Sequence, residues 1–217
     1  MRSEPVYHNM EQRTPEWYAV RRGVLTASGL KPWLLNRSAT SNKARSKVLR
    51  QLASERHDED EWDVKEREAK QRSMSFIPAV ARGVALEADA LALFSEENPG
   101  FTNVGFVRRG WIGCSPDAIN LERKHGLEIK CPSAATMIDY CVDRTLPEDY
   151  ALQVHISMYV TGFKAWNFLA YSTKYFPVCI RILYDEFTEK VGLALDEFQI
   201  ELEEQIQIDK KYSYDRK

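Results

Sequence analysis

The sequence contains little of what defines several classes of protein. Its four cysteines (Cys114, Cys131, Cys141 and Cys179) form no Cys-x-x-Cys or Cys/His pairing, which argues against a disulfide framework and a structural zinc site. No run reaches the ~20 apolar residues of a membrane span, and no signal-peptide core follows Met1-Arg2-Ser3-Glu4. With only 10 Gly and 9 Pro in 217 residues, the chain is not low-complexity or collagen-like. We therefore expect a cytoplasmic protein that is not exported.

The composition that is present suits one globular domain. Hydrophobic residues make up 44% and charged residues 29% of the chain, and this length can bury a substantial core. We find no internal repeat and no linker. We therefore expect a single domain over 1–217, with a helical N-terminal part (1–75), a central core (76–184) and a C-terminal helix (185–217).

Charge is unevenly distributed along the chain. Residues 1–50 hold ten Lys and Arg against three Asp and Glu, a net of +7, although the whole chain is at −2. Residues 185–217 hold five against ten, a net of −5. The basic N-terminal part predicts an electropositive surface that could meet an anionic partner, but a solvated basic face explains the same counts.

The first half of the chain reads as helices. Thr14-Pro15-Glu16 is a helix start, with Thr as the cap and Pro in the first turn. Thr26-Ala27-Ser28 indicates a second start, whose backbone N–H groups could face an anion. Residues 42–72 carry nine Lys and Arg against eight Asp and Glu, which predicts an exposed helix or a mobile segment outside the core. Residues 78–97 have the most regular helical pattern.

The second half alternates between strands and helices. Residues 101–131 predict a meander of short strands, 148–160 a helix, and 166–172 and 177–184 two more strands. The last helix carries one apolar stripe: Phe187, Val191, Leu195, Phe198, Leu202 and Ile206. This order predicts an α/β or α+β fold around one central mixed sheet flanked by helices.

Glu87 interrupts an apolar stripe. In the 78–97 helix it shares the stripe with Val80, Val84, Leu91 and Phe94. A buried carboxylate without a partner is costly, so Glu87 should have a cation or a proton. A salt bridge at the rim of the helix explains the position equally well.

Two further carboxylates come close together in the predicted meander. Asp117 follows a Ser-Pro turn, which alone is common turn chemistry. Period-two alternation over 126–131 puts Glu128 and Lys130 on one face of a strand, and that face could simply be the solvent side. An antiparallel neighbour would instead bring Asp117 and Glu128 close enough to share a hard cation.

Pro116-Asp117, ten residues, then Glu128-Ile129-Lys130 is the pattern of the PD-(D/E)xK nucleases, and Glu87 on the preceding helix adds to the match. More of the chain resembles the lambda-type phage exonucleases, the YqaJ-like viral recombinase family. The similar segments are, in order, Trp17–Ser28, Gly83–Glu87, Cys114–Asp117, Gly126–Pro132, Gln153–Tyr159 and Ala165-Trp166. The resemblance implies a restriction-endonuclease-like core.

The resemblance also implies a site for two Mg²⁺ ions, with Mn²⁺ able to substitute. Asp117 would contact both ions, Glu128 and the Ile129 carbonyl would complete the first site, and Glu87 would serve the second. Lys130 would hold the attacking water or stabilise the charge on the phosphate.

Further site residues follow from the same resemblance. Gln153 would orient water or phosphate. A pocket for a 5′-terminal phosphate is implied at Arg21, Ser28 and Ser115, with Arg37 as a fourth candidate at a different spacing. Residues 74–80 are apolar where the family has a strand-separating wedge, although packing at the start of the helix explains them as well.

The implied function is a Mg²⁺-dependent, processive 5′→3′ exonuclease. It would act on duplex DNA from 5′-phosphorylated ends and leave 3′ single strands for phage-type homologous recombination. The resemblance further implies a ring of three subunits, a single-strand annealing recombinase as partner, and a phage or prophage origin in the cytoplasm of a bacterial host.

Three alternatives stay open at this point. An endonuclease of restriction or repair type could use the same fold, and it would cut a closed circle. A DNA-binding subunit with a dead site is disfavoured by the complete Glu87, Asp117, Glu128 and Lys130 set. A Ser/His/Asp hydrolase is disfavoured because the sequence has no Gly-x-Ser-x-Gly and its four histidines are scattered.

Overall fold

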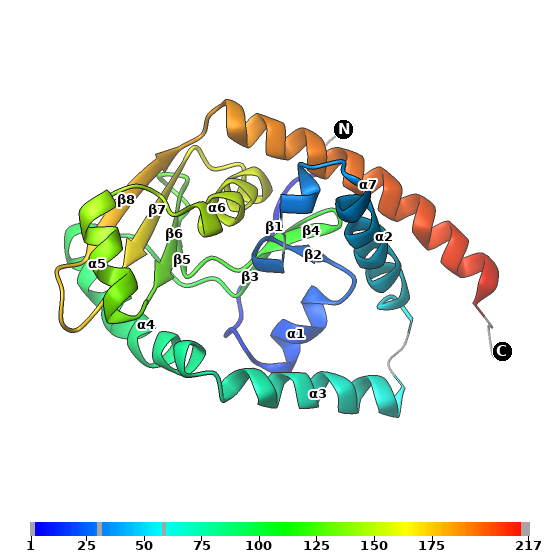
Figure 1. Ribbon diagram of the computed structural model, residues 1–217, viewed down its shortest axis with the longest axis horizontal. Coiled ribbons are helices and arrows are strands. Elements are labelled where there is room, and N and C mark those ends of the chain that lie inside the picture. The colour runs from blue at the N-terminus through cyan, green and yellow to red at the C-terminus, as the bar shows by residue number, and fades with distance from the viewer. Residues whose placement is uncertain (1–2, 30–31, 58–59, 214–217) are drawn as a thin grey trace.

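The strands pair into two separate four-stranded sheets (Figure 1). The computed structural model describes residues 3–29, 32–57 and 60–213. The first sheet has the order β1-β3-β4-β2 and the second β5-β6-β7-β8. The strands are β1 (Val6–His8), β2 (Leu25–Thr26), β3 (Phe106–Arg109), β4 (Ile112–Cys114), β5 (Ala118–Asn120), β6 (His125–Lys130), β7 (Ala165–Ala170) and β8 (Val178–Leu183).

Helices surround both sheets, with α3 and α4 along one side in Figure 1 and α7 along the other. They are α1 (Pro15–Arg21), α2 (Ala39–Ser54), α3 (Glu61–Ser75), α4 (Pro78–Glu97), α5 (Ala134–Asp143), α6 (Glu148–Thr161) and α7 (Glu186–Tyr212). Two three-residue 3-10 helices, η1 (Ala27–Gly29) and η2 (Pro32–Leu34), follow β2. None of the helices in these described ranges is both long and apolar enough to cross a membrane.

The mixed α/β class is confirmed, since each sheet pairs neighbouring strands in both parallel and antiparallel directions. The expected single sheet was wrong. The meander of residues 101–131 divides at Ser115-Pro116-Asp117, where the chain leaves β4 of the first sheet and enters β5 of the second. Proline cannot donate a ladder hydrogen bond, and alternation alone does not reveal which strand becomes a neighbour.

Most predicted helices are present. Thr14 caps α1 by accepting from the Trp17 N–H, α4 and α6 cover the expected residues, and the apolar stripe of α7 is buried except for the half-buried Phe187. The helix start at Thr26 was wrong, because this segment forms β2 and then only η1. Strand β1 and helix α5 were not expected, although Ser133 caps α5 in the ordinary way.

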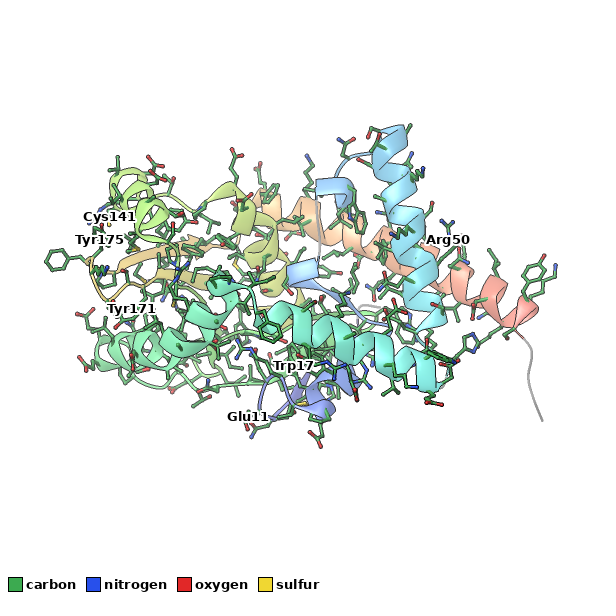
Figure 2. The ribbon with its side chains drawn as sticks, turned by 60° about the horizontal axis from the view of Figure 1, so that its bottom comes forward. Glu11, Trp17, Arg50, Cys141, Tyr171 and Tyr175 are labelled. Atoms are coloured by element: carbon green, nitrogen blue, oxygen red, sulfur yellow. The ribbon has the colours of Figure 1, made fainter. Side chains whose placement is uncertain are left out.

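The densely charged stretch 42–72 also differs from the expectation. It forms two helices, and α2 buries Leu49 and Leu52 in the main core while its other side faces solvent, with Arg50 on the outer side (Figure 2). An amphipathic helix hides its apolar stripe among many charges, so the high charge density concealed a core element.

A second hydrophobic cluster fixes the strand that matters most for the site. Ala90 and Phe94 of α4 pack on Leu127 and Ile129 of β6. On the other side of the sheet β6 has Gly126, where a Cβ atom would lie 2.2 Å from the Trp166 ring. Glycine is therefore required here for the close approach of β6 and β7.

One buried ion pair joins α2 to α7. Arg45 donates from Nε to Oε2 of Glu201 over 2.5 Å and from Nη2 to Oε1 over 3.1 Å, and its side chain is only 3% exposed. Arg37 reaches the same carboxylate from the surface, at 3.3 Å. The two arginines share one partner and differ in burial.

We predict that Glu201→Ala lowers the free energy of unfolding by about 2–4 kcal/mol, because it leaves a buried guanidinium unpaired. Arg37→Ala should cost under about 1 kcal/mol, since its pair is exposed. Urea denaturation of both variants measures the difference. Equal losses would mean that Arg45 does not depend on Glu201.

Candidate active site

The β5–β6 hairpin brings two of the expected carboxylates together. Ala118 pairs with Leu127 in antiparallel register, and the Asp117 N–H donates to the Leu127 carbonyl over 3.1 Å. The Ile129 N–H in turn donates to Oδ2 of Asp117 over 2.5 Å. The predicted approach of Asp117 to the Glu128 strand is therefore confirmed, and the register places Asp117 across from Glu128.

The solvent-side alternative was wrong for Glu128, which is buried, and Lys130 beside it is half-buried. Glu128 is 3% exposed. Its Oε1 accepts from Lys130 Nζ and, over 2.6 Å, from Gln153 Nε2 of α6. Burial opposes the charge of Lys130, but the carboxylates of Glu128 and Asp117 outweigh burial and raise its pKa. Lys130 is thus a fixed cation, and Gln153 holds the carboxylate beside it.

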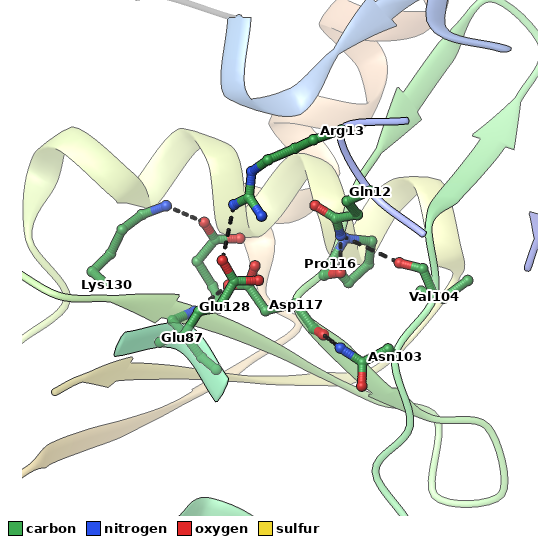
Figure 3. Close-up of polar contacts among 10 residues, drawn as sticks. Gln12, Arg13, Glu87, Asn103, Val104, Pro116, Asp117, Glu128 and Lys130 are labelled. Carbon is green, nitrogen blue, oxygen red and sulfur yellow. Dashed lines mark hydrogen bonds and ion pairs between the residues drawn. The ribbon is translucent and has the colours of Figure 1, made fainter. Parts of the chain in front are cut away.

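Glu87 lies at the rim of α4 and faces the same site. Its Oε2 accepts from Nη2 of Arg13 over 2.9 Å (Figure 3). It also lines an open cleft of about 410 Å³ together with Asp117 and Ile129. The salt bridge expected at the rim is therefore present, and the role of Glu87 at a metal ion stays a prediction.

Polar side chains hold the segment that carries Asp117. Gln12 Nε2 donates to the carbonyl oxygens of Pro116 (2.9 Å) and Val104 (3.3 Å), and Asn103 Nδ2 donates to the Asp117 carbonyl over 3.3 Å (Figure 3). Sequence reasoning missed Gln12, Arg13 and Asn103. All three lie in loops, where no periodicity marks them, and the only local signal was their position next to a helix start or a strand.

The site carries more negative than positive charge. Burial raises the pKa of Asp117 well above its ordinary value, the carboxylates of Glu128 and Glu87 raise it further, and Lys130 and the Ile129 N–H oppose them. Carboxylate and carbonyl oxygens are the ligands that hard divalent cations prefer. The donor set therefore fits such a cation, which would relieve the excess charge at Asp117.

The three carboxylates are not gathered around one point, however. Across the residues that the structure describes, no group of three acidic, His or Cys side chains is close enough to hold an ion as it stands. Each carboxylate instead accepts from a protein donor: Arg13, the Ile129 N–H, or Lys130 with Gln153. Cation binding would thus exchange some of these donors.

A second polar group lies on the same segment. Ser115 Oγ accepts from Arg21 Nη1 over 2.7 Å and from Trp17 Nε1 over 3.1 Å. The Arg21 guanidinium lies 3.8 Å from the Trp17 ring centroid. Burial lowers the pKa of Arg21 to about 10, which leaves it cationic at neutral pH. Within the described part of the chain no carboxylate pairs with it, so this half-buried cation is suited to an anionic ligand.

The other two candidates for anion binding differ. Ser28 is exposed, and it follows the Thr26–Gly113 pair of the parallel strands β2 and β4, so Ser28 and Ser115 leave the same end of neighbouring strands. η1 is too short to provide a helix N-terminus. Arg37 instead pairs with Glu197 (2.5 Å) and Glu201 (3.3 Å) of α7.

Comparison with known proteins identifies the family. Residues 16–164 match the YqaJ-like viral recombinase domain. The chain belongs to this family. A search of curated proteins found no match. Every expected site residue lies inside the matched range, whereas Gln12 and Arg13 precede it.

Solved structures agree on the fold. A crystal structure of an alkaline exonuclease (LHK-Exo) from Laribacter hongkongensis is similar with a TM-score of 0.70 and 24% identity, over 91% of this chain and 97% of that one. Its complex with dAMP gives 0.64 and 23%, over 92% and 100%. The fold is of the PD-(D/E)xK type. Family and fold together support a nuclease function.

The raised pKa of Asp117 predicts that its charged carboxylate destabilises the folded protein in the absence of an ion. Folding raises the pKa of this carboxyl, so the unfolded chain loses the proton first as the pH rises above about 4. The free energy of unfolding therefore decreases as the pH rises, because of this group. Asparagine does not titrate. In EDTA at pH 8, Asp117→Asn should therefore be about 1–2 kcal/mol more stable than wild type.

Denaturation between pH 4 and 8 measures the difference in the free energy of unfolding between Asp117→Asn and wild type, and this difference should decrease as the pH falls. A variant that is less stable at pH 8, or a gap that does not change with pH, would contradict the electrostatic account of Asp117.

Proposed function

We propose that this protein is a Mg²⁺-dependent exonuclease that degrades duplex DNA in the 5′→3′ direction from 5′-phosphorylated ends. One observation carries the proposal. Ser115, which binds the half-buried cation Arg21, lies two residues before Asp117, which faces Glu128 and Glu87. A group suited to a terminal phosphate is thus built into the segment that carries Asp117, one of the three carboxylates suited to hydrolysis.

The carboxylates and one carbonyl would hold the ions. Asp117, Glu128 and the Ile129 carbonyl would hold one Mg²⁺, and Glu87 with Asp117 a second, with Mn²⁺ able to substitute. When bound, such ions supply an activated water and neutralise charge on the phosphate. Lys130, held against Glu128, would place a compact cation beside the attacking water or the phosphate. Gln153 would keep the Glu128 carboxylate in position.

Arg21 and Ser115 would bind the 5′-phosphate. A terminal phosphate carries close to two negative charges at neutral pH, so the pocket should favour it over an internal one. The guanidinium already contacts the Trp17 ring and donates to Ser115, which restricts its position before the ligand arrives. Ser28 would join from the neighbouring strand end. Arg37 would have to leave Glu197 and Glu201 to take part.

The wider assembly rests on resemblance. We propose a ring of three subunits that acts processively, a single-strand annealing recombinase that receives the 3′ strand, and a role in phage-type recombination in a bacterial cytoplasm. Phe76 and Ile77, just before α4, are 84% and 42% exposed. They are therefore free to act as the strand-separating wedge, and packing does not account for them.

An endonuclease on the same fold is the competing proposal. It needs no DNA end, so it would cut a covalently closed circle. The half-buried Arg21 next to Ser115 favours the exonuclease, because a pocket for a terminal phosphate has no use in an enzyme that cuts within a strand. Incubation of closed and linearised forms of one plasmid distinguishes the two, and only the linear form should be degraded.

The catalytic residues give the first test. Asp117→Ala and Glu128→Ala should lower the rate on end-labelled duplex more than about 100-fold, because charge on the phosphate is no longer neutralised. Lys130→Ala should be similarly impaired and still bind divalent ions. Rates are measured with and without Mg²⁺, and circular dichroism checks folding. An Asp117→Ala protein with a tenth or more of wild-type turnover would remove this assignment.

Arg21 gives the second test. Arg21→Ala should slow digestion of 5′-phosphorylated ends about ten- to a hundredfold more than that of 5′-hydroxyl ends, because one charge-assisted contact is lost. Arg21→Lys should recover only part, since a single ammonium cannot donate two parallel bonds. The comparison uses kcat/KM for both ends. If both ends slowed equally, Arg21 would be structural, and the nuclease proposal would be unaffected.

A further inference from the structure

Arg13 has an unfavourable backbone conformation beside the cleft. Its φ angle is 70°, in the left-handed region, and it lies in the turn before the Thr14 cap. Among the residues that the structure describes, two other non-glycine residues share this region: Lys124 in the β5–β6 turn and Arg144 at the end of α5. The conformation costs an arginine about 1 kcal/mol or more, and glycine would avoid that cost. The side chain of Arg13 should therefore have a use.

The turn that carries Arg13 is anchored to the segment Ser115-Pro116-Asp117. The preceding residue, Gln12, donates to the carbonyls of Pro116 and Val104. Arg13 therefore stays beside Asp117 whether or not its own side chain is paired. Figure 3 shows the guanidinium reaching from this turn to Glu87, over the position of Asp117.

The ion pair of Arg13 is the easiest of the site's contacts to break. The side chain of Arg13 is 48% exposed and that of Glu87 24%, so water screens the pair and it is weak. By contrast, Glu128 is buried with Lys130 and Gln153, and Asp117 accepts from a backbone N–H that cannot move away. Glu87 is thus the one site carboxylate whose present partner can easily leave.

We propose that Arg13 is an exchangeable counter-ion. In the metal-free protein it neutralises Glu87; a divalent ion that binds Glu87 displaces it, and the freed guanidinium then contacts a DNA phosphate in the cleft. The inference rests on the metal-dependent nuclease activity proposed above. It adds a residue outside the range that matches the family, and it links metal loading to DNA binding.

The energetics make such an exchange feasible. An ion with two positive charges attracts Glu87 and Asp117 more strongly than one guanidinium does. The exposed pair is still strong enough to reduce the apparent affinity for the ion about two- to fivefold, because the ion binds only the fraction in which Glu87 is free. Once released, Arg13 can donate two parallel bonds to a phosphate.

The test compares two binding constants in Arg13→Gln. Calorimetry measures the affinity for Ca²⁺, an ion that should bind without supporting cleavage. The variant should bind Ca²⁺ about two- to fivefold more tightly than wild type. Fluorescence anisotropy with a 5′-phosphorylated duplex in saturating Ca²⁺ gives DNA affinity, and it should become about three- to tenfold weaker. Arg13→Lys should lie between. Arg123→Gln, an exposed arginine in the β5–β6 turn, is the matched control and should change neither.

Opposite shifts of the two constants support the proposal, because loss of a merely structural arginine would weaken both. Weakening of both, or an unchanged metal affinity, would overturn it. Tighter metal binding with unchanged DNA binding would show that Arg13 does not contact a DNA phosphate, and it would overturn that part of the proposal. If neither wild type nor variant bound Ca²⁺ or Mn²⁺, the metal assignment of the proposed function would fail as well. Arg13→Gly, which relieves the backbone strain, serves if Arg13→Gln does not fold.

Discussion

The whole arrangement depends on how the chain passes from one sheet to the other. Cys114 ends β4 in the first sheet and Ala118 begins β5 in the second, so Ser115, Pro116 and Asp117 are fixed at both ends. Gln12 and Asn103 hold the carbonyls of Pro116 and Asp117. Two polar groups of the site are placed relative to this link: Arg21 through Ser115, and Glu128 through the β5–β6 register.

The distribution of charge in the candidate site follows from this geometry. The link brings Asp117 next to Glu128 and across a cleft from Glu87, in a place where burial penalises charge. Lys130 and Arg13 supply the positive charge that the protein itself contributes. They differ in kind, because Lys130 is on the same strand as Glu128, whereas Arg13 comes from a turn and is half exposed. Lys130 and Arg13 therefore offset part of the negative charge of the site, and only the Arg13 pair is exposed enough to exchange easily.

Local patterns predicted which side chains of the site lie together better than they predicted the architecture. Alternation over 126–131 placed Glu128 and Lys130 on one face, and the turn at Pro116 placed Asp117 opposite, because these are properties of one hairpin. The division into two sheets could not be predicted, since periodicity does not identify a strand's neighbour. Leu49 and Leu52 were missed because the charges around them suggested an exposed segment. Arg13 was missed because its role depends on a contact with Glu87, 74 residues away.

The short link also has a consequence for what the proposed enzyme would release. Ser115 and Asp117 are two residues apart, and even a fully extended chain spans at most about 7 Å over that separation. Suppose that Ser115 holds the terminal phosphate and Asp117 acts at the bond to be cut. The backbone then fixes the distance between these two points, and that distance is close to the length of one nucleotide. Product size would then be set by the polypeptide itself, and mononucleotides would be released at each step.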